Sequence, residues 1–555
     1  MRGAGWLTAA LFAALLPPAA IAKDGGTVVV AQTTASPVDA TLPDTRAGTD
    51  ISAPAATETT GTLPIPPLQI GGYIDAAVGY STNGRGGTGG KGSDDSFLRG
   101  TLGGYLQYFH PRLSADLSYS LTGIYWSKFH SQNHITNRLN LTSRLVAIED
   151  TLIVRANAFA APADLTRAGS LSASGEPTSR FNTRDTYGYF VQPEYIQRFK
   201  DFFTSTLSFG HGGVFFVRPG TAATVPPPIT PARNSYSTTI TEEIKSGTYF
   251  ERLQWSVIGS YAQFNQTVRS QRSEEGLVNF TYAATRWLKV FGIGGYNDFR
   301  STTTLAKNLS GPTGLGGVTL TNGADLTVTV EAGTQNNFPT YMGSVRWIIS
   351  PLTHFIAEAT DAVSTPQGDI LSRLARQGVT NFGNFNSGGL YGLGLNNIDT
   401  GTGLGSIGGF SSFGPGGLAL DNGIYRIRSL YGTLQHSSDR NTFSLGVFAT
   451  ERDRLDVPVT KVLPRTSVYG LRATAGRQLN QYMTVSANLT YSIGNEFGGH
   501  DQIFHASVVG NYRLTEMIDL YLTNHYSHRD SKSLAGFVNA PVSEDQIILG
   551  IRAHF

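Results

Sequence analysis

The chain has 555 residues, of which 40% are hydrophobic, and a length and apolar content of this size exclude a disordered polymer. Only 15% of the residues are charged, well below the roughly 25% usual in soluble proteins. The formal net charge of +2 favours neither a nucleic-acid partner nor an acidic substrate. The sequence contains no cysteine, which excludes disulfides and cysteine-ligated metals.

Residues 1–22 have the pattern of an export signal. Arg2 supplies the positive charge, GAGWLTAALFAALL supplies a short apolar core, and Ala-Ile-Ala at 20–22 supplies a cleavage site. No apolar run of about 18 residues follows, so no transmembrane helix is expected after the signal. The exported chain is then either a soluble protein or a transmembrane β-barrel. Residues 23–66, rich in Ala, Thr and Pro, are expected to be a disordered periplasmic segment.

The hydrophobic period favours strands. In 113–125 and in 483–493, apolar and polar side chains alternate at every second position, whereas a helix has a period of 3.6. Such segments run for about 10 to 14 residues, which is long for a soluble sheet but sufficient to cross a bilayer at a tilt. Aromatic residues near the segment ends predict girdles at the two membrane interfaces: Phe109, Tyr125, Trp126, Phe199, Phe202, Phe203, Trp287, Trp347, Tyr482 and Tyr512.

About twenty such strands fit between residues 67 and 555, with 18 and 22 as alternatives. Tight links, such as His-Pro at 110–111, alternate with long links, of which 300–338 and 364–423 are the longest. Short periplasmic turns and long extracellular loops are typical of outer-membrane barrels, and closure leaves no unpaired backbone group facing lipid. The predicted fold is all-β, a transmembrane antiparallel up-and-down β-barrel. A soluble all-β protein, such as a propeller or tandem sandwiches, is the alternative, but the sequence shows no propeller repeat of about 40 to 50 residues.

The phase of the predicted strands assigns charged residues to the inner face. Lumen-lining arginines are expected at Arg138, Arg144, Arg155, Arg346, Arg472, Arg513 and Arg552, and lumen-lining acids at Asp116, Glu358 and Asp519. The predicted lumen is polar and moderately basic, and a preference for anionic solutes follows as a hypothesis. The alternative is that these arginines pair with acids as structural ladders around the wall.

The final strand, 545–555, carries a second signal. Ile547, Leu549, Ile551, Ala553 and Phe555 form its lipid-facing row, while Gln546, Arg552 and His554 point into the lumen. A terminal aromatic on such a strand resembles the signal that the barrel-assembly machinery recognises, with the free strand edge available for pairing. Phe555, Ile551 and Leu549 are therefore the predicted assembly signal.

No catalytic motif is evident. The sequence has no G-x-S-x-G elbow and no H-E-x-x-H metal spacing. His505, His525 and His554 fall on inward faces of neighbouring strands, where the expected role is hydrogen bonding rather than metal binding. We expect neither an enzyme nor a cofactor or metal site.

Residues 364–423 form a long insertion rich in glycine and apolar residues. An insertion of this length is usually functional or disordered. Folded inward it would constrict the pore, and folded outward it would bind a partner or form part of the cell surface. Its composition would also suit self-association, so a homo-oligomer is an open alternative.

The stretch GTVVVAQ at 26–32 is weakly similar to the energy-coupling box of TonB-dependent receptors. Those receptors follow the box with a plug domain much longer than the segment 23–66. With the first strand expected near residue 69, we expect no such plug.

Residues 94–159, from DDSFLRGTLGGYLQYFHPRLSADLSYSL to LVAIEDTLIVRANAF, carry a family resemblance. They resemble outer-membrane β-barrel proteins associated with exopolysaccharide loci and with the PEP-CTERM/exosortase system. The resemblance covers about the first five strands, and the insertions at 300–338 and 364–423 depart from it. It implies a large barrel without enzymatic motifs that acts in exopolysaccharide production or export. The family offers no established functional residues to transfer.

Three functions are therefore weighed for a barrel located in the outer membrane of a Gram-negative bacterium. The first is a conduit or accessory for surface polysaccharide. The second is a general or anion-selective diffusion porin, and the third is a structural or adhesive surface protein. The implied partners are outer-membrane lipid and lipopolysaccharide, the barrel-assembly machinery and a polysaccharide, with no nucleic acid.

Overall fold

The structure is a computed structural model that describes residues 68–84, 93–164, 183–217, 233–266, 269–303, 305, 308–323, 325–365, 423–456, 465–496, 499–532 and 541–555. Among these residues, no helix has the length and apolar character needed to span a membrane. The expected export signal at 1–22, the segment 23–66 and residues 366–422 of the expected loop lie outside the described residues.

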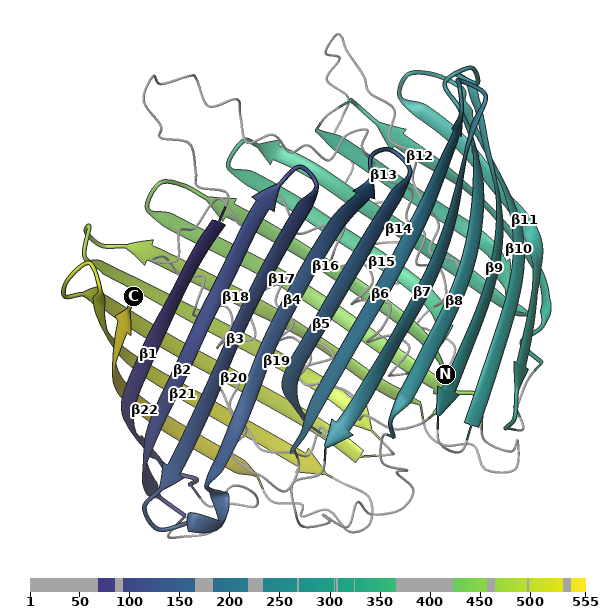
Figure 1. Ribbon diagram of the computed structural model, residues 1–555. Coiled ribbons are helices and arrows are strands. Elements are labelled where there is room, and N and C mark those ends of the chain that lie inside the picture. The colour runs from purple at the N-terminus through teal and green to yellow at the C-terminus, as the bar shows by residue number, and fades with distance from the viewer. Residues whose placement is uncertain are drawn as a thin grey trace, which may run out of the picture.

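The described residues form a single 22-stranded antiparallel sheet (Figure 1). The strands are β1 Leu68–Ser81, β2 Asp95–His110, β3 Leu113–Trp126, β4 His134–Ile148, β5 Leu152–Asp164, β6 Thr183–Phe199, β7 Phe203–Val217, β8 Ser235–Ser246, β9 Leu253–Gln266, β10 Arg269–Ala283, β11 Leu288–Ser301, β12 Gly311–Thr321, β13 Leu326–Gln335, β14 Phe338–Ser350, β15 Thr353–Ser364, β16 Tyr425–Ser437, β17 Asn441–Arg454, β18 Thr466–Gln478, β19 Met483–Glu496, β20 Gly499–Arg513, β21 Ile518–Lys532 and β22 Val542–His554. A short 3-10 helix, His130–Gln132, lies between β3 and β4.

The sheet closes on itself. Each strand pairs with its neighbours in the sequence, and β1 also pairs with β22 over nine residue pairs, from Tyr73 opposite His554 to Ser81 opposite Gln546. Gly72 and Phe555 extend this seam with two backbone hydrogen bonds of 2.8 and 3.0 Å. Closure leaves no strand edge unpaired, as a chain in lipid requires. The predicted up-and-down barrel is confirmed.

The strand number is 22, one of the two alternatives, so the expected twenty was two too few. The difference comes from 300–338, which was expected to be a long loop but contains β12 and β13. Two tight turns bound these strands. The four-residue link 322–325 joins β12 to β13 and includes Gly323 at φ 110°, and the two-residue link Asn336-Asn337 joins β13 to β14, with φ of 52° and 60°. Asn and Gly accept positive φ at low cost, which makes such pairs favourable hairpin turns.

The links define the two ends of the barrel. Every link from an even to an odd strand is short, such as 111–112 after β2 and 351–352 after β14, and these mark the periplasmic end. The opposite end carries the longer links, including 365–424 after β15, and is extracellular. Three extracellular links nevertheless have only two residues, after β9, β13 and β19.

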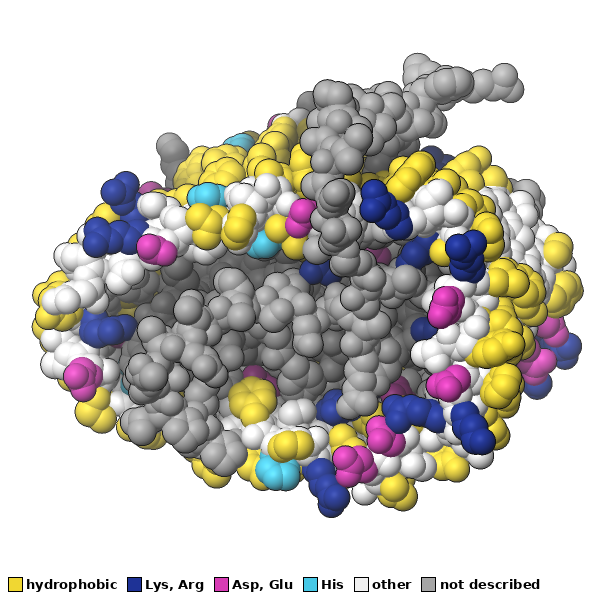
Figure 2. Space-filling model, turned by 90° about the horizontal axis from the view of Figure 1, so that it is seen from above, with side chains coloured by type: hydrophobic (Ala, Val, Ile, Leu, Met, Phe, Trp, Pro, Cys, Tyr) yellow, Lys and Arg dark blue, Asp and Glu magenta, His cyan; other side chains and the backbone are white. Residues whose placement is uncertain are grey.

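The outer face is apolar across the middle of the barrel. In the view from above, hydrophobic side chains line much of the outer edge of the molecule (Figure 2). On β22, Leu549 and Ile551 are 55% and 44% exposed, and they alternate with buried inward positions such as Ile548. Aromatic residues sit at strand ends with their rings exposed, among them Tyr125, Trp287 and Tyr482. An apolar outer belt between aromatic girdles fits a bilayer and not water. The protein is an outer-membrane β-barrel of a Gram-negative bacterium.

Two aromatic residues expected in a girdle lie on the inner face. Phe109 stands opposite Ser114, which stands opposite the inward Arg144, so Phe109 shares that inner row. Trp126 is 2% exposed and packs against Phe97, with ring centroids 4.8 Å apart. Its partner across β2 and β3 is Phe97, on the inner face. Trp126 directly follows the outward Tyr125, and adjacent residues of a strand point to opposite faces.

Inside the barrel, several aromatic rings lie over glycines of the neighbouring strand. A Cβ built at Gly188 would lie 2.1 Å from the Phe159 ring, and one at Gly470 would lie 2.2 Å from Phe448. Each of these rings stands directly opposite its glycine in the register. Glycine at these positions lets the ring lie flat along the wall, which fills the inner surface without projecting far into the lumen.

Candidate functional site: the barrel lumen

The register decides which side chains line the lumen. Residues directly opposite one another on neighbouring strands share a face of the sheet, so rows that contain buried polar side chains can be separated from rows of exposed apolar ones. The inner rows contain all ten of the residues expected there: Arg138, Arg144, Arg155, Arg346, Arg472, Arg513, Arg552, Asp116, Glu358 and Asp519.

Only some of these arginines are held by acids. Arg155 on β5 forms an ion pair with Glu194 on β6, and both side chains are buried. Arg552 on β22 pairs with Asp75, with its Nε 3.2 Å from Asp75 Oδ2. For these two arginines, the ion pairs expected of a structural ladder are present. In contrast, no ion pair to a described residue is found for Arg346 or Arg472.

The inner rows also hold charged residues that the sequence reading did not assign. The additional acids include Asp75, Glu194, Glu243, Glu275, Glu331, Asp501 and Glu544, and the additional bases include Arg99, Lys289, Arg452 and Arg529, all of them well shielded from solvent. The wall is therefore of mixed charge. Counting in steps of two from exposed apolar residues of the same strand would have assigned several of these charged residues to the inner face. Ile240 is outward, which puts Glu243 on the opposite face.

A buried charged cluster joins the first and last strands. Asp75 on β1 is 1% exposed and accepts a 2.9 Å hydrogen bond from Tyr521 Oη on β21. Arg552 on β22 contacts the same carboxylate, and Arg99 on β2 donates a 2.8 Å hydrogen bond to Tyr521 Oη. The Arg552 guanidinium also lies 5.2 Å from the centroid of the Tyr73 ring. We call these residues the seam cluster; they come from four strands that meet only when the barrel is closed.

A second ionic contact crosses the extracellular mouth. Asp456 follows β17 and forms an ion pair with Arg269 at the start of β10, and Arg454 donates a 2.7 Å hydrogen bond to its other oxygen. Because β10 and β17 are not neighbours in the sheet, this contact connects separate parts of the wall. An apolar cluster lies at the same end: Leu309, Val363, Ile424 and Leu455. Ordered side chains therefore connect β10 with the end of β17 on this side of the barrel.

The inner face of β1 to β4 carries two tyrosine rings beside polar groups. Tyr105 lies over Gly71, where a Cβ would be 2.3 Å from its hydroxyl, and Tyr73 lies in the same way over Gly103. Polar side chains continue the surface: Gln107 Nε2 donates a 3.1 Å hydrogen bond to Asp116 Oδ2, while Ser118 and Asn140 stand in the same row as Tyr105. We call this surface the tyrosine strip: Tyr73, Tyr105, Gln107, Asp116, Ser118 and Asn140.

The three inward histidines do not form one site. His505 Nδ1 lies 2.9 Å from Ser527 Oγ, and His554 Nε2 lies 2.9 Å from Asp519 Oδ2. His525 is 4% exposed. Within the part of the chain that the structure describes, no cluster of three or more His, Cys, Asp or Glu side chains is arranged to hold a metal ion.

We expect Arg346 and Arg472 to set the ion preference of the lumen, because they are inward bases that no described acid neutralises. Replacing both with glutamate should turn an anion preference into a cation preference in planar bilayers, measured as the reversal potential in a salt gradient. Arg112→Glu is the control, since Arg112 lies in the β2–β3 link with its side chain 70% exposed. An unchanged reversal potential in the double variant would show that other groups set the preference.

Comparison with known proteins gives similarity of shape without similarity of sequence. No protein-family model matches the chain, and no curated protein matches it. Among solved structures, the FrpB iron transporter from Neisseria meningitidis has a TM-score of 0.45 and 8% identity, covering 88% of this chain and 81% of that one. The siderophore receptor PiuA from Acinetobacter baumannii has a TM-score of 0.45 and 10% identity, with 87% and 82% covered. The siderophore receptor PirA from Pseudomonas aeruginosa has a TM-score of 0.36 and 9% identity, with 88% and 80% covered.

Proposed function

We propose that this outer-membrane barrel is a conduit or accessory for surface polysaccharide. The observation that carries the proposal is the tyrosine strip on the inner wall of β1 to β4. It combines two flat tyrosine rings with carboxylate, amide and hydroxyl groups on neighbouring strands. The proposal assigns the protein no catalytic step.

The strip matches the chemistry of a sugar chain. A pyranose ring has an apolar face of C–H groups, which packs on an aromatic ring, and a rim of hydroxyls that need planar hydrogen-bonding partners. Tyr73 and Tyr105 supply the rings, and both are only half-buried. Such a wall offers weak contacts along a path, which suits passage better than tight binding.

The sequence resemblance supports the same proposal. Residues 94–159, which resemble barrels associated with exopolysaccharide loci, include β2, β3, β4 and most of β5. Three of the four strands of the tyrosine strip therefore fall in that segment. The additional acids of the inner wall make an acidic polymer only one of the classes that the wall would accept; neutral sugars fit its hydroxyl and amide groups equally.

Removing both rings tests the proposal. In cells, Tyr73→Ala with Tyr105→Ala should reduce the polysaccharide recovered from the surface and medium, while the amount of heat-modifiable barrel in the outer membrane stays unchanged. The matched control is Phe448→Ala. Phe448 lies on β17, far from the strip, and its inward ring covers Gly470 of β18. Equal polysaccharide from the double variant and the wild type, with both barrels folded, would count against the proposal.

A diffusion porin is the second candidate, favoured by the polar and charged inner wall of a 22-stranded barrel. Barrels of about 16 to 18 strands already enclose an aqueous channel. Large, steady single-channel conductance of the purified protein, unaffected by removal of the two tyrosines, would support the porin.

A further inference from the structure

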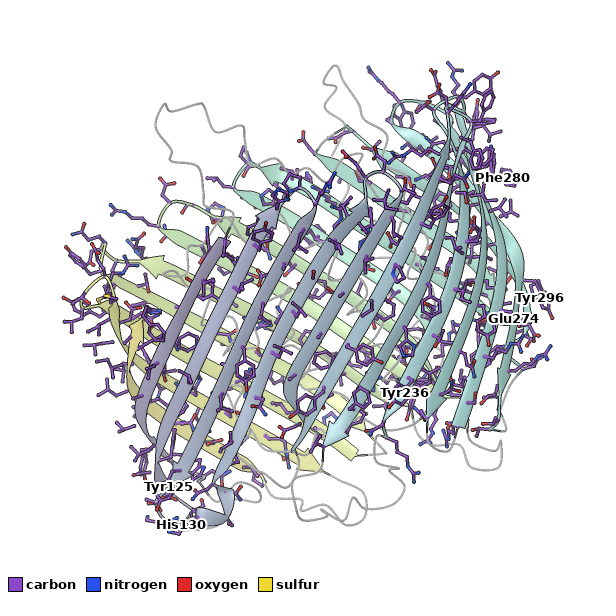
Figure 3. All side chains as sticks on the ribbon, viewed as in Figure 1. Tyr125, His130, Tyr236, Glu274, Phe280 and Tyr296 are labelled. Atoms are coloured by element: carbon purple, nitrogen blue, oxygen red, sulfur yellow. The ribbon has the colours of Figure 1, made fainter. Side chains whose placement is uncertain are left out.

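The outer face of β8 to β12 combines three features, and we call it the contact face. It carries an acid at mid-height, a charged group at its extracellular rim, and a stretch of bare backbone between them. Figure 3 shows Phe280, Tyr296 and Glu274 of this face pointing away from the barrel. Elsewhere on the outer face, rows such as Leu549 and Ile551 on β22 are large and apolar.

Glu242 on β8 is the acid at mid-height. Its row runs through Leu207 and Gly259, which stand opposite it on the two neighbouring strands, and Leu207 is 43% exposed to lipid. Followed strand by strand, the row starts at Leu152, at the periplasmic end of β5, and reaches Pro312, at the extracellular end of β12. Since β8 crosses the row close to its middle, Glu242 lies near the middle of the belt.

A carboxylate at this depth is unfavourable against acyl chains. Ser205 Oγ on β7 donates a hydrogen bond to Glu242 Oε1, which satisfies one of its two oxygens. Ionisable residues in the membrane interior rarely face lipid and usually meet another protein surface. The position of Glu242 therefore indicates a protein partner on this side of the barrel.

The charges at the rim indicate which partner. Arg272 pairs with Glu274 on β10, and Arg300 pairs with Asp298 on β11 with an Nη2 to Oδ2 distance of 2.6 Å. Arg272 stands opposite Arg300, and Asp298 lies two residues closer to the periplasm on β11. Because the strands are tilted, the rise along a row from β10 to β11 nearly cancels the descent of two residues along β11, so Arg272 and Asp298 lie at similar heights. A second copy related by a twofold axis along the membrane normal would thus meet this rim with opposite charges at matching height.

The backbone between the acid and the rim is uncovered. A Cβ built at Gly259, Gly276, Gly294, Gly314 or Gly316 would meet no atom within 4 Å. Gly276 stands opposite Gly259, and Gly316 opposite Gly292, so these positions are contiguous. Large side chains of a partner can therefore approach the sheet closely here, as small residues allow at membrane interfaces.

We infer that the contact face binds a second copy of this chain in the same orientation, forming a twofold dimer in the outer membrane. The dimer covers Glu242 with protein and pairs the rim charges of one copy with those of the other. This assignment is independent of what passes through the lumen.

The absence of native cysteine makes crosslinking a clean test. Gly276→Cys and Gly292→Cys, introduced singly and treated with a short bismaleimide in intact outer membranes, should give a band of twice the monomer mass. The matched control is Gly510→Cys on β20, an outward glycine whose Cβ also meets nothing within 4 Å, on the other side of the barrel. Heat modifiability on gels confirms that each variant is folded.

A second variant distinguishes a specific dimer interface from random collision of barrels in the membrane. A Cβ at Gly276 meets nothing within 4 Å, so Gly276→Leu should fill the bare surface and abolish the crosslink at Gly292→Cys while leaving the barrel folded. Gly510→Leu should leave that crosslink intact. No dimer at either cysteine, an equal band from Gly510→Cys, or an adduct of another mass would overturn the inference.

Discussion

Replacing Asp75 with asparagine is expected to destabilise the barrel strongly. Asp75 is 1% exposed and is the acid shared by Arg552 and Tyr521, with Arg99 3.7 Å away. Asparagine keeps the size of the side chain but leaves two arginines without their counter-charge. Removing one partner of a buried ion pair costs about 3–5 kcal/mol. Urea titration of the refolded barrel, followed by tryptophan fluorescence, would measure the loss.

Asp519→Asn is the matched control for this prediction. Asp519 lies on β21 and also contacts β22, but its side chain is 25% exposed and its Oδ2 lies 2.9 Å from His554 Nε2. We expect a loss well below that of Asp75→Asn, because partly exposed pairs contribute about 1 kcal/mol or less. Adding Arg552→Gln to Asp75→Asn should restore part of the stability by removing one uncompensated charge. Equal losses from the two asparagine variants would refute a special role for the seam cluster.

Replacing Phe555 with alanine is expected to impair assembly more than stability. Phe555 is 66% exposed on the lipid side, and its ring lies over Gly72 of β1, where a Cβ would be 2.6 Å from Cε2. The ring therefore lies across the β1–β22 seam. In cells, we expect much less folded protein in the outer membrane. The purified protein refolded into detergent should unfold at nearly the wild-type urea concentration, because an exposed ring contributes little burial.

Phe443→Ala is the control for the assembly prediction. Phe443 is an outward phenylalanine near the periplasmic end of β17, 43% exposed, and it lies away from the seam. Its replacement should leave the amount of inserted barrel close to that of the wild type. If both variants inserted equally well, Phe555 would be an ordinary girdle residue, and the predicted assembly signal, which includes Ile551 and Leu549, would lose its main member.

The missed strands show where a local pattern stops being sufficient. β12 and β13 contain many glycines and threonines, for example GPTGLGGVTLT, so their apolar alternation is weak and their composition is that of a loop. The turn signals Asn322-Gly323 and Asn336-Asn337 were present in the sequence and would have indicated two hairpins. What the strands lack in side-chain pattern is supplied by backbone pairing with β11 and β14, which any residue except proline can provide.

The charged residues of the inner face show the same contrast between local sequence pattern and pairing between strands. The parity of Arg138, Arg472 and Asp519 could be assigned from the sequence, because adjacent residues of a strand always face opposite sides. Their partners could not be assigned. Arg155 meets Glu194 only because β5 and β6 pair in one register, and a slip of one residue would place them on opposite faces.

The sequence by itself determined that this protein is a β-barrel and which side of each recognised strand faces lipid, because a period of two is a local property of the chain. The tertiary structure decided that there are 22 strands, that Asp75 on β1 meets Arg552 on β22, and that Arg269 meets Asp456 across the mouth. These contacts join residues far apart in the chain, and they exist only once closure fixes the register of every strand against its neighbours.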